Sequence, residues 1–334
     1  AVTGLQHQVE SGERALILQP ARDRVSVPYL HELTLRLTLG AAQLDPSVEQ
    51  RHAGWLKTQQ RPDGGFAGRE GESDPYYTAF ALRALWILGA LDETTGKRAA
   101  DFLRGRLSHK ESIIDLISLI FAAAICELSV GQVVISDDVV AGRENVAALL
   151  SSLRTADGGF AKTPEGRAGS TYQTFLSVLC YELIEVAIPD VDRIESFLES
   201  QRDDLGGYRE IRAAKRPGVN PTAAAIGTLK TLGKLNVADQ HNTACFLAEM
   251  QSEEGGLTAN TRIPFADLLS SFTGLLTLAD LDAVSQVNVD AVIRYALSMQ
   301  LPEGGFAGFS LDQTADVEYS FYGLATLALC QSCQ

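Results

Sequence analysis

Histidine and cysteine, from which most protein metal and redox sites are built, are scarce in this sequence of 334 residues. The five histidines are scattered along the chain, and we assign none of them to a metal site or a catalytic triad. The five cysteines are odd in number and have no dense spacing beyond one CxxC at 330–333, which argues against a disulfide framework and favours a reducing compartment. We therefore predict that the protein has no metal site.

Positive charge and long apolar runs are also in short supply. Asp and Glu number 42 against 28 Lys and Arg, so the formal net charge is -14. Such a chain would repel the phosphates of nucleic acid. The longest apolar run, residues 116–126, is shorter than the roughly 20 residues that cross a bilayer. We predict a cytoplasmic protein that binds no nucleic acid, and leave open whether it contacts a membrane at its surface.

What the sequence does contain is a recurring Gly-Gly pair followed by an aromatic residue or leucine, first seen in residues 60–66 (QRPDGGF). The first glycines of the pairs are Gly64, Gly158, Gly206, Gly255 and Gly304. The steps between them are 94, 48, 49 and 49 residues, and 94 is close to twice 47. A repeat with an eroded signature is therefore expected near residues 104–130. The spacing predicts six repeats of roughly 48 residues.

Each repeat follows one plan, in which an amphipathic segment, the Gly-Gly turn and a variable loop precede a much more apolar helix. In the first repeat we expect an outer helix over 48–60 and an inner helix over 75–91, capped by Ser73 or Asp74. A helix that is apolar on nearly all faces must be buried, whereas an amphipathic one faces water on one side. Later inner helices are expected to begin near Glu111, Ser170, Asn220, Asp267 and Asp316.

These patterns predict an all-α fold and a single domain over residues 1–334. Residues 1–45 would contain N-terminal helices, at 5–19 and 29–44. Residues 46–334 would form six helix pairs that close into an α/α (α6-α6) barrel, because each pair buries its apolar face only against the next. The inner helices would surround a central apolar cavity.

The succession of a helix ending in Gln, a Gly-Gly-Phe turn and an apolar helix resembles the repeat shared by protein prenyltransferase β subunits and squalene-type (class II) terpene cyclases. The resemblance covers about 280 of the 334 residues. It implies an α/α barrel whose cavity holds an isoprenoid. In length and in having one barrel, the chain is most similar to single-domain class II cyclases of the merosterolic acid synthase type, which close rings on a prenylated dihydroxybenzoate.

Motif positions distinguish the two branches. The prenyltransferase branch binds zinc through Asp-x-Cys and Asp-x-x-His-Thr, and the matching segments here are residues 267–269 (DLL) and 316–320 (DVEYS). Leu269 and Tyr319 thus stand at the positions of the thiolate and the imidazole, and neither can replace those soft ligands on a tetrahedral zinc. The basic residues expected before the fifth Gly-Gly turn are replaced by residues 251–254 (QSEE). The cyclase acid motif, Asp-x-Asp-Asp, is also absent as such, and residues 316–319 are its closest match.

Three carboxylic acids are candidates for the proton donor that a class II cyclase requires. Asp115 is our first choice because it lies among isoleucines and leucines, where desolvation would favour the neutral acid. The alternative for Asp115 is that it caps its own helix. Glu318 matches the family motif by position, but a helix N-terminus favours the ionised form. Asp267 has an apolar setting similar to that of Asp115 and is the third candidate.

Aromatic residues gather near the starts of the expected inner helices. A cation over such a ring gains on the order of 2 kcal/mol when desolvated, although aromatic residues are also common in helix packing. The ten that we predict to contact substrate are Tyr76, Tyr77, Phe80, Trp86, Tyr172, Phe175, Phe265, Phe272, Tyr319 and Tyr322.

The sequence and the resemblance together predict a class II terpene cyclase that protonates a linear isoprenoid, with a prenylated aromatic compound as one candidate substrate. No cofactor is expected, and Mg²⁺ would assist only if the substrate carried a diphosphate. The expected partner is a lipophilic isoprenoid, with no obligatory protein partner. Three alternatives stay open at this point: a zinc-free prenyltransferase-like subunit, a non-catalytic isoprenoid carrier, and a carbohydrate enzyme with two carboxylates.

Overall fold

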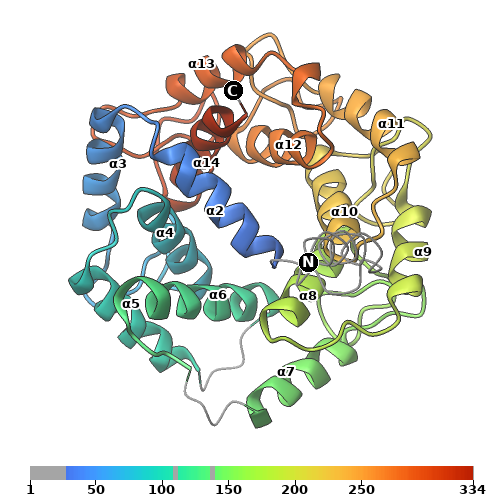
Figure 1. The fold of residues 1–334 in the computed structure, drawn as a ribbon, viewed down its shortest axis with the longest axis horizontal. Coiled ribbons are helices and arrows are strands. Elements are labelled where there is room, and N and C mark those ends of the chain that lie inside the picture. The colour runs from blue at the N-terminus through green and yellow to red at the C-terminus, as the bar shows by residue number, and fades with distance from the viewer. Residues whose placement is uncertain (1–27, 108–111, 136–139, 334) are drawn as a thin grey trace, which may run out of the picture.

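A computed structural model describes residues 28–107, 112–135 and 140–333. Within these ranges the secondary structure is helical, with only isolated bridges between loops. Six inner helices form a closed ring, in which each helix packs against the next and the last returns to the first (Figure 1). The inner helices are α4 (Pro75–Ile87), α6 (Ile113–Val130), α8 (Thr171–Leu183), α10 (Val219–Thr231), α12 (Leu268–Asp280) and α14 (Val317–Ser332).

A second layer of helices surrounds this ring (Figure 1). Its members are α3 (Pro46–Thr58), α5 (Glu93–Arg106), α7 (Val140–Ser152), α9 (Val191–Gln201), α11 (Val237–Ala248) and α13 (Val289–Ser298), with a short 3-10 helix, η2 (Val284–Gln286), before α13. The all-α barrel of six helix pairs is confirmed, and the pair α5 and α6 is the repeat with the eroded signature. The helix predicted over 5–19 lies outside the described residues. None of the helices in the described ranges is both long and apolar enough to cross a membrane.

Each Gly-Gly turn lies between the outer and inner helices of one pair and packs against the next outer helix. Gly158 has φ 99°, a conformation that glycine adopts without steric cost. Its neighbour Gly159 is required for a different reason, because a Cβ there would lie 2.8–2.9 Å from ring atoms of Phe197 in α9. The backbone N–H of Phe160 then donates to Thr174 Oγ1 in α8, at 3.0 Å. The same bond recurs in the other repeats with the signature, to Thr78, Thr222, Ser271 and Ser320.

The ring closes where α3 meets the last Gly-Gly turn. The backbone N–H of Gly305 donates to His52 Nδ1 at 2.9 Å, and His52 Nε2 lies 3.2 Å from Gln300 Oε1. The imidazole is completely buried and stacks on Phe306, with ring centroids 4.4 Å apart. Burial lowers the pKa of His52 from 6.5 to about 4. A neutral, buried imidazole therefore links the first and sixth repeats.

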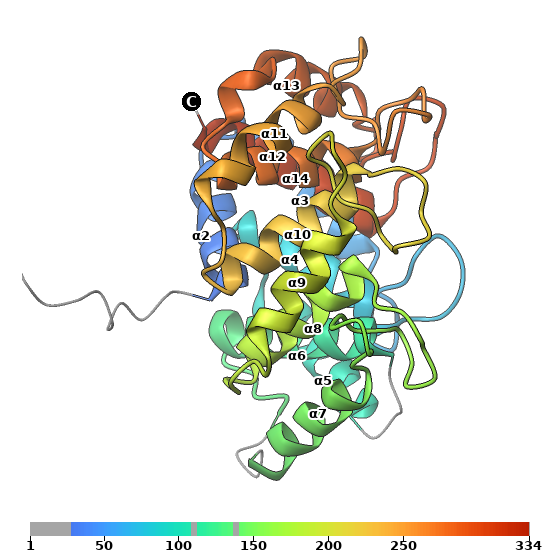
Figure 2. The same cartoon turned by 90° about the vertical axis from the view of Figure 1, so that its right-hand side faces the viewer.

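The predicted helix at 29–44 is observed as α2 (Tyr29–Ala41), which crosses one end of the ring. Figure 2 shows that this end lies opposite the long loops that carry the Gly-Gly turns. The Asp280 side chain at the end of α12 is 2% exposed and binds Tyr29 Oη (3.1 Å), Arg36 Nη1 (3.4 Å) and Lys230 Nζ (2.8 Å). These contacts fasten α2 as the floor of the barrel, at the C-terminal ends of the inner helices.

Candidate functional site

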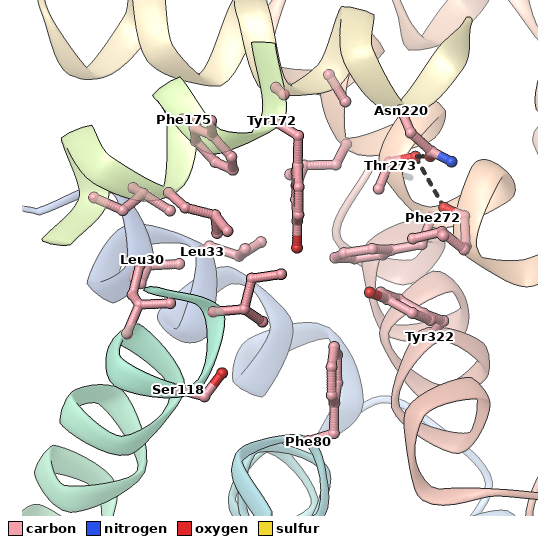
Figure 3. A pocket seen from close by; sticks show the side chains of 18 of the residues that line it. Leu30, Leu33, Phe80, Ser118, Tyr172, Phe175, Asn220, Phe272, Thr273 and Tyr322 are labelled. Atoms are coloured by element: carbon pink, nitrogen blue, oxygen red, sulfur yellow. Dashed lines mark hydrogen bonds between the residues drawn. The ribbon is translucent and has the colours of Figure 1, made fainter. Parts of the chain in front are cut away.

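A cavity of about 460 Å³ lies inside the ring, lined by residues of α2 and of all six inner helices (Figure 3). This volume is in the range of ordinary small-molecule sites. Each inner helix presents a face with helical spacing, as α6 does through Ile114, Ile117, Ser118 and Phe121. The lining is mainly aliphatic and aromatic, so the cavity suits an apolar ligand.

Aromatic side chains form much of the wall. Phe80 of α4 lies with its centroid 5.3 Å from that of Tyr322, and Tyr322 lies 5.7 Å from Phe272. In Figure 3 these three rings surround the same space as Tyr172 and Phe175. Six of the ten aromatic residues predicted to contact substrate line the cavity: Tyr76, Phe80, Tyr172, Phe175, Phe272 and Tyr322. These rings could stabilise a positively charged ligand by cation–π contact.

Glu318, in the first turn of α14, is a carboxylic acid in the cavity wall. Burial raises its pKa, which outweighs a lowering by the hydrogen bond from Tyr76 Oη to Glu318 Oε1 (2.7 Å). The nearby Asp316 and Asp74 raise the pKa further. Desolvation is thus the largest influence on the pKa of this carboxyl, and it opposes the ionisation that the helix N-terminus favours. Glu318 is able to hold a proton and to present it to a ligand in the cavity.

Glu210, in the loop between α9 and α10, is a second carboxyl in the lining, and the sequence analysis did not name it. It accepts hydrogen bonds from Ser170 Oγ and from the Tyr172 backbone N–H, the latter at 3.4 Å. Burial raises the pKa of Glu210, against the effect of these two bonds. The cavity thus contains two carboxyls whose pKa values are raised by burial.

Arg83 of α4 also lines the cavity, and the sequence analysis missed it as well. Its guanidinium carbon lies 4.1 Å from the centroid of Phe321, 5.3 Å from that of Phe121 and 5.7 Å from that of Phe80. Burial lowers the pKa of Arg83 from 12.5 to about 10, so it stays cationic at neutral pH. The sequence did contain a signal for it. Arg83 follows Tyr76 by seven residues and Phe80 by three, and this spacing places all three on one face of the helix.

A model of the prenyltransferase alpha-alpha toroid domain matches residues 21–197 and 174–334, which together cover most of the chain. The chain belongs to this family. No curated protein matches the sequence. The toroid described by the family model is the closed double ring of helices seen in the structure.

Solved structures resemble this toroid over most of its length. Candida albicans protein geranylgeranyltransferase-I, complexed with GGPP, is 16% identical over 84% of this chain and 91% of its own, with a TM-score of 0.66. The type II terpene cyclase MstE from Scytonema, in complex with its substrate geranylgeranyl dihydroxybenzoate, is 14% identical over 91% of this chain and 99% of its own, with a TM-score of 0.57. A possible member of the GH105 family from Klebsiella pneumoniae is 13% identical over 100% of this chain and 98% of its own, with a TM-score of 0.54. At such low identities, the structural similarity shows a shared fold and no more.

Asp115, our first choice for the acid, does not line the toroid's cavity. The cavity face of α6 contains Ile114 and Ser118. Consecutive residues of a helix are rotated by about 100° around its axis, so Asp115 lies off this face. Its Oδ2 accepts a hydrogen bond from the exposed Ser112 Oγ at 2.7 Å. The expectation that Asp115 is enclosed by apolar side chains and faces the cavity is wrong.

Asp267 and Asp316 serve as helix caps in the toroid. Asp267 accepts from the backbone N–H (2.7 Å) and Oγ (2.8 Å) of Ser270, and although burial raises its pKa it does not line the cavity. Asp316 accepts from the backbone N–H of Tyr319 at 2.8 Å and forms an ion pair with Arg69 at 2.9 Å. Of our three candidate acids, the structure places only Glu318 in the cavity lining.

The other four predicted contact residues, Tyr77, Trp86, Phe265 and Tyr319, are not among the cavity-lining residues. Tyr77 and Tyr319 each lie one position beyond a lining residue, and their rings pack under Gly68 and Gly308 of the loops. Trp86 lies in the last turn of α4 and packs against the core. Phe265 is in the loop before α12 and is 40% exposed. Proximity to a helix start was therefore insufficient, because the helical register decides which rings face inward.

The positions that match the zinc ligands of prenyltransferases hold side chains with other roles. Leu269 lines the cavity, and Tyr319 packs beneath Gly308 with Arg69 near its ring, 6.0 Å from the centroid. Across the described ranges, no three His, Cys, Asp or Glu side chains come together in a way that could hold a metal ion.

Proposed function

We propose that the protein is a class II terpene cyclase that protonates a linear isoprenoid with Glu318. The observation that carries the proposal is a carboxyl with a raised pKa in the wall of an aromatic, largely apolar cavity. Two solved structures of similar fold hold isoprenoids, GGPP in one and geranylgeranyl dihydroxybenzoate in the other. They support an isoprenoid as the ligand class of this cavity.

In the proposed reaction, the neutral Glu318 carboxyl transfers its proton to one carbon of a terminal alkene. The two π electrons form the new C–H bond, and a tertiary carbocation remains on the other carbon. The next alkene attacks this cation, forms a ring C–C bond and moves the positive charge along the chain. The last cation loses a proton to a base, so the product is an isomer of the substrate.

Each local feature of the site has a part in this chemistry. Burial keeps the proton on Glu318 until an alkene arrives, and the Tyr76 hydroxyl stabilises the carboxylate that forms after transfer. Phe272 and Tyr322 present π faces to the migrating charge. The apolar lining excludes water, which would otherwise quench the cation early. None of these steps uses a metal, so we propose that the reaction requires none.

The test is product analysis by mass spectrometry after incubation with linear polyprenyl compounds and prenylated benzoates, in EDTA. The wild type should yield a cyclic isomer of unchanged mass in H₂O, and one heavier by a single deuterium in D₂O. Glu318→Gln should reduce turnover by about 10²- to 10⁴-fold, the range for loss of a general acid. Asp115→Asn, the matched change on another inner helix, should keep turnover. Binding without any cyclic product, or a fully active Glu318→Gln variant, would contradict the proposal.

A further inference from the structure

Arg83 is a half-buried cation in the cavity wall, for which the described part of the chain supplies no counter-charge. Neither a hydrogen bond nor an ion pair of Arg83 with any described residue is present, and the guanidinium lies instead against the phenyl rings of Phe80, Phe121 and Phe321. Removing an unpaired charge from water is unfavourable even after the protein relaxes. Cation–π contacts with the three rings offset only part of that cost. An anion is therefore the missing complement of this site.

The carboxyls of the cavity do not provide that anion. Glu318 is hydrogen-bonded to Tyr76, and Glu210 is hydrogen-bonded to Ser170 and to the Tyr172 backbone. Burial favours the neutral form of both carboxyls. The positive charge of Arg83 thus faces the cavity without compensation from these two side chains.

Arg83 also lies deeper in the barrel than Glu318 does. Its Cα lies about 10 Å further along α4 than that of Tyr76, the hydrogen-bond partner of Glu318, at 1.5 Å per residue. Its guanidinium lies against Phe321, about one turn after Glu318 on α14. The inner helices run from the loop end towards the floor formed by α2, so Arg83 is on the floor side of Glu318.

We propose that Arg83 binds an anionic head group of the isoprenoid, a carboxylate or a phosphate, and that the ligand lies with its head towards α2 and its hydrocarbon end towards Glu318. This inference rests on the proposed function and names its substrate class. The planar guanidinium matches both anions through paired hydrogen bonds. The orientation brings the terminal alkene, the part of a class II substrate that is farthest from the head, to the acid.

Pairing of Arg83 with an anionic head group would also favour the formation of a carbocation in the cavity. Phe321 and Phe80 belong to the aromatic wall, and an uncompensated guanidinium at their faces would oppose a carbocation forming nearby. A bound carboxylate or phosphate neutralises that charge. A neutral isoprenol should therefore be a poorer ligand and a poorer substrate than the corresponding acid.

The experiment measures binding of three ligands with one C20 chain, namely geranylgeraniol, geranylgeranoic acid and geranylgeranyl diphosphate, by equilibrium dialysis in EDTA. We expect Arg83→Met to weaken binding of the acid or the diphosphate by about 10- to 100-fold, the range of charge-assisted hydrogen bonds, and to leave the alcohol unchanged. The anion whose affinity falls more in Arg83→Met identifies the head group. Arg83→Lys, which keeps the charge, should retain part of the preference. Arg143→Met, which removes one exposed positive charge from α7, should change none of the three.

The outcomes separate the two proposals. An unchanged preference for anion over alcohol in Arg83→Met, in protein whose circular dichroism matches the wild type, overturns the role of Arg83 while the isoprenoid cavity stands. A wild type that binds none of the three ligands overturns the proposed function, and the inference with it. If Arg83→Met does not fold, the test rests on Arg83→Lys and on the ratio of the wild-type affinities for the acid and the alcohol. Equal wild-type affinities for the acid and the alcohol would overturn the inference.

Discussion

Acidification should loosen the ring at the junction between the first and sixth repeats, because His52 is buried there as a neutral base. Its Nδ1 accepts the Gly305 N–H, and protonation at that nitrogen would abolish the bond. The pKa of His52 falls from 6.5 to about 4 in the folded protein, with burial as the main cause. Between these pH values the unfolded chain binds a proton that the folded chain does not. The free energy of unfolding must therefore fall as the pH decreases through this window.

The size of the effect follows from the same pKa values. One pKa unit corresponds to about 1.4 kcal/mol, so the His52 contribution lost between pH 6.5 and pH 4 is about 3 kcal/mol. Buried carboxyls act in the opposite direction, since the raised pKa values of Glu318, Glu210 and Asp267 make their protonation stabilise the folded state. The pH dependence of the wild type alone mixes the two effects. The quantity to measure is the difference between the wild type and a variant without the imidazole.

His52→Gln is that variant, because an amide oxygen can accept the Gly305 N–H but does not titrate. Urea unfolding followed by circular dichroism at several pH values between 4.5 and 7.5 gives the free energy of unfolding of each protein. The advantage of the wild type over His52→Gln should shrink steadily below pH 6.5. His31→Gln, on the exposed surface of α2, is the matched control and should show no such trend. A wild-type advantage that is constant over the whole range would refute the reasoning.

Four further predictions follow from the geometry. Gly159→Ala should lower the free energy of unfolding by about 1–3 kcal/mol, because the new Cβ would clash with Phe197. Gly54→Ala, in an exposed part of α3 with open space around it, should instead raise it by up to about 1 kcal/mol. Urea unfolding measures both changes. Asp280→Asn should cost about 3 kcal/mol and increase hydrogen exchange in α2, because it removes the buried negative charge that pairs with Arg36 and Lys230; unchanged exchange would contradict the floor role. Tyr172→Leu and Phe272→Leu should divert products to earlier-quenched rings, whereas Tyr319→Leu, outside the lining, should not, as product profiles would reveal. Cyclase activity should fall as the pH rises through the raised pKa of Glu318, and a pH–rate profile without this loss would point to another acid.

The fold was predictable because its determinants are local and recur. The spacing of Gly64, Gly158, Gly206, Gly255 and Gly304 indicated the number of helix pairs, and the difference between amphipathic and apolar helices indicated the two layers. The contact between Gly159 and the ring of Phe197 could not be predicted from this spacing, because contact with the following outer helix is a tertiary feature.

The candidate site was predictable only in part, because its chemistry depends on helical register. Asp115 and Ile114 are neighbours in the sequence, yet only Ile114 lines the cavity. The face defined by Tyr76 and Phe80 would have included Arg83, had the spacing been carried one turn further along α4. The balance that raises the pKa of Glu318 was not accessible from the sequence, since it depends on how deeply the first turn of α14 is enclosed by α4 and its neighbours.

The charges at the two ends of the cavity follow from how the barrel is built. All six inner helices begin at the loop end, so their positive dipole ends converge there and would attract an anion. Carboxylate caps, Asp74 on α4, Asp267 on α12 and Asp316 on α14, occupy three of these helix starts and offset that attraction. The cation that would complement a ligand's anion is instead Arg83, nearer the floor. An anion delivered to the loop end would meet acidic caps, whereas one that passes towards α2 would meet an unpaired guanidinium. The head-inward orientation is therefore the one that the electrostatics of the barrel favours, and it leaves Glu318 for the hydrocarbon end.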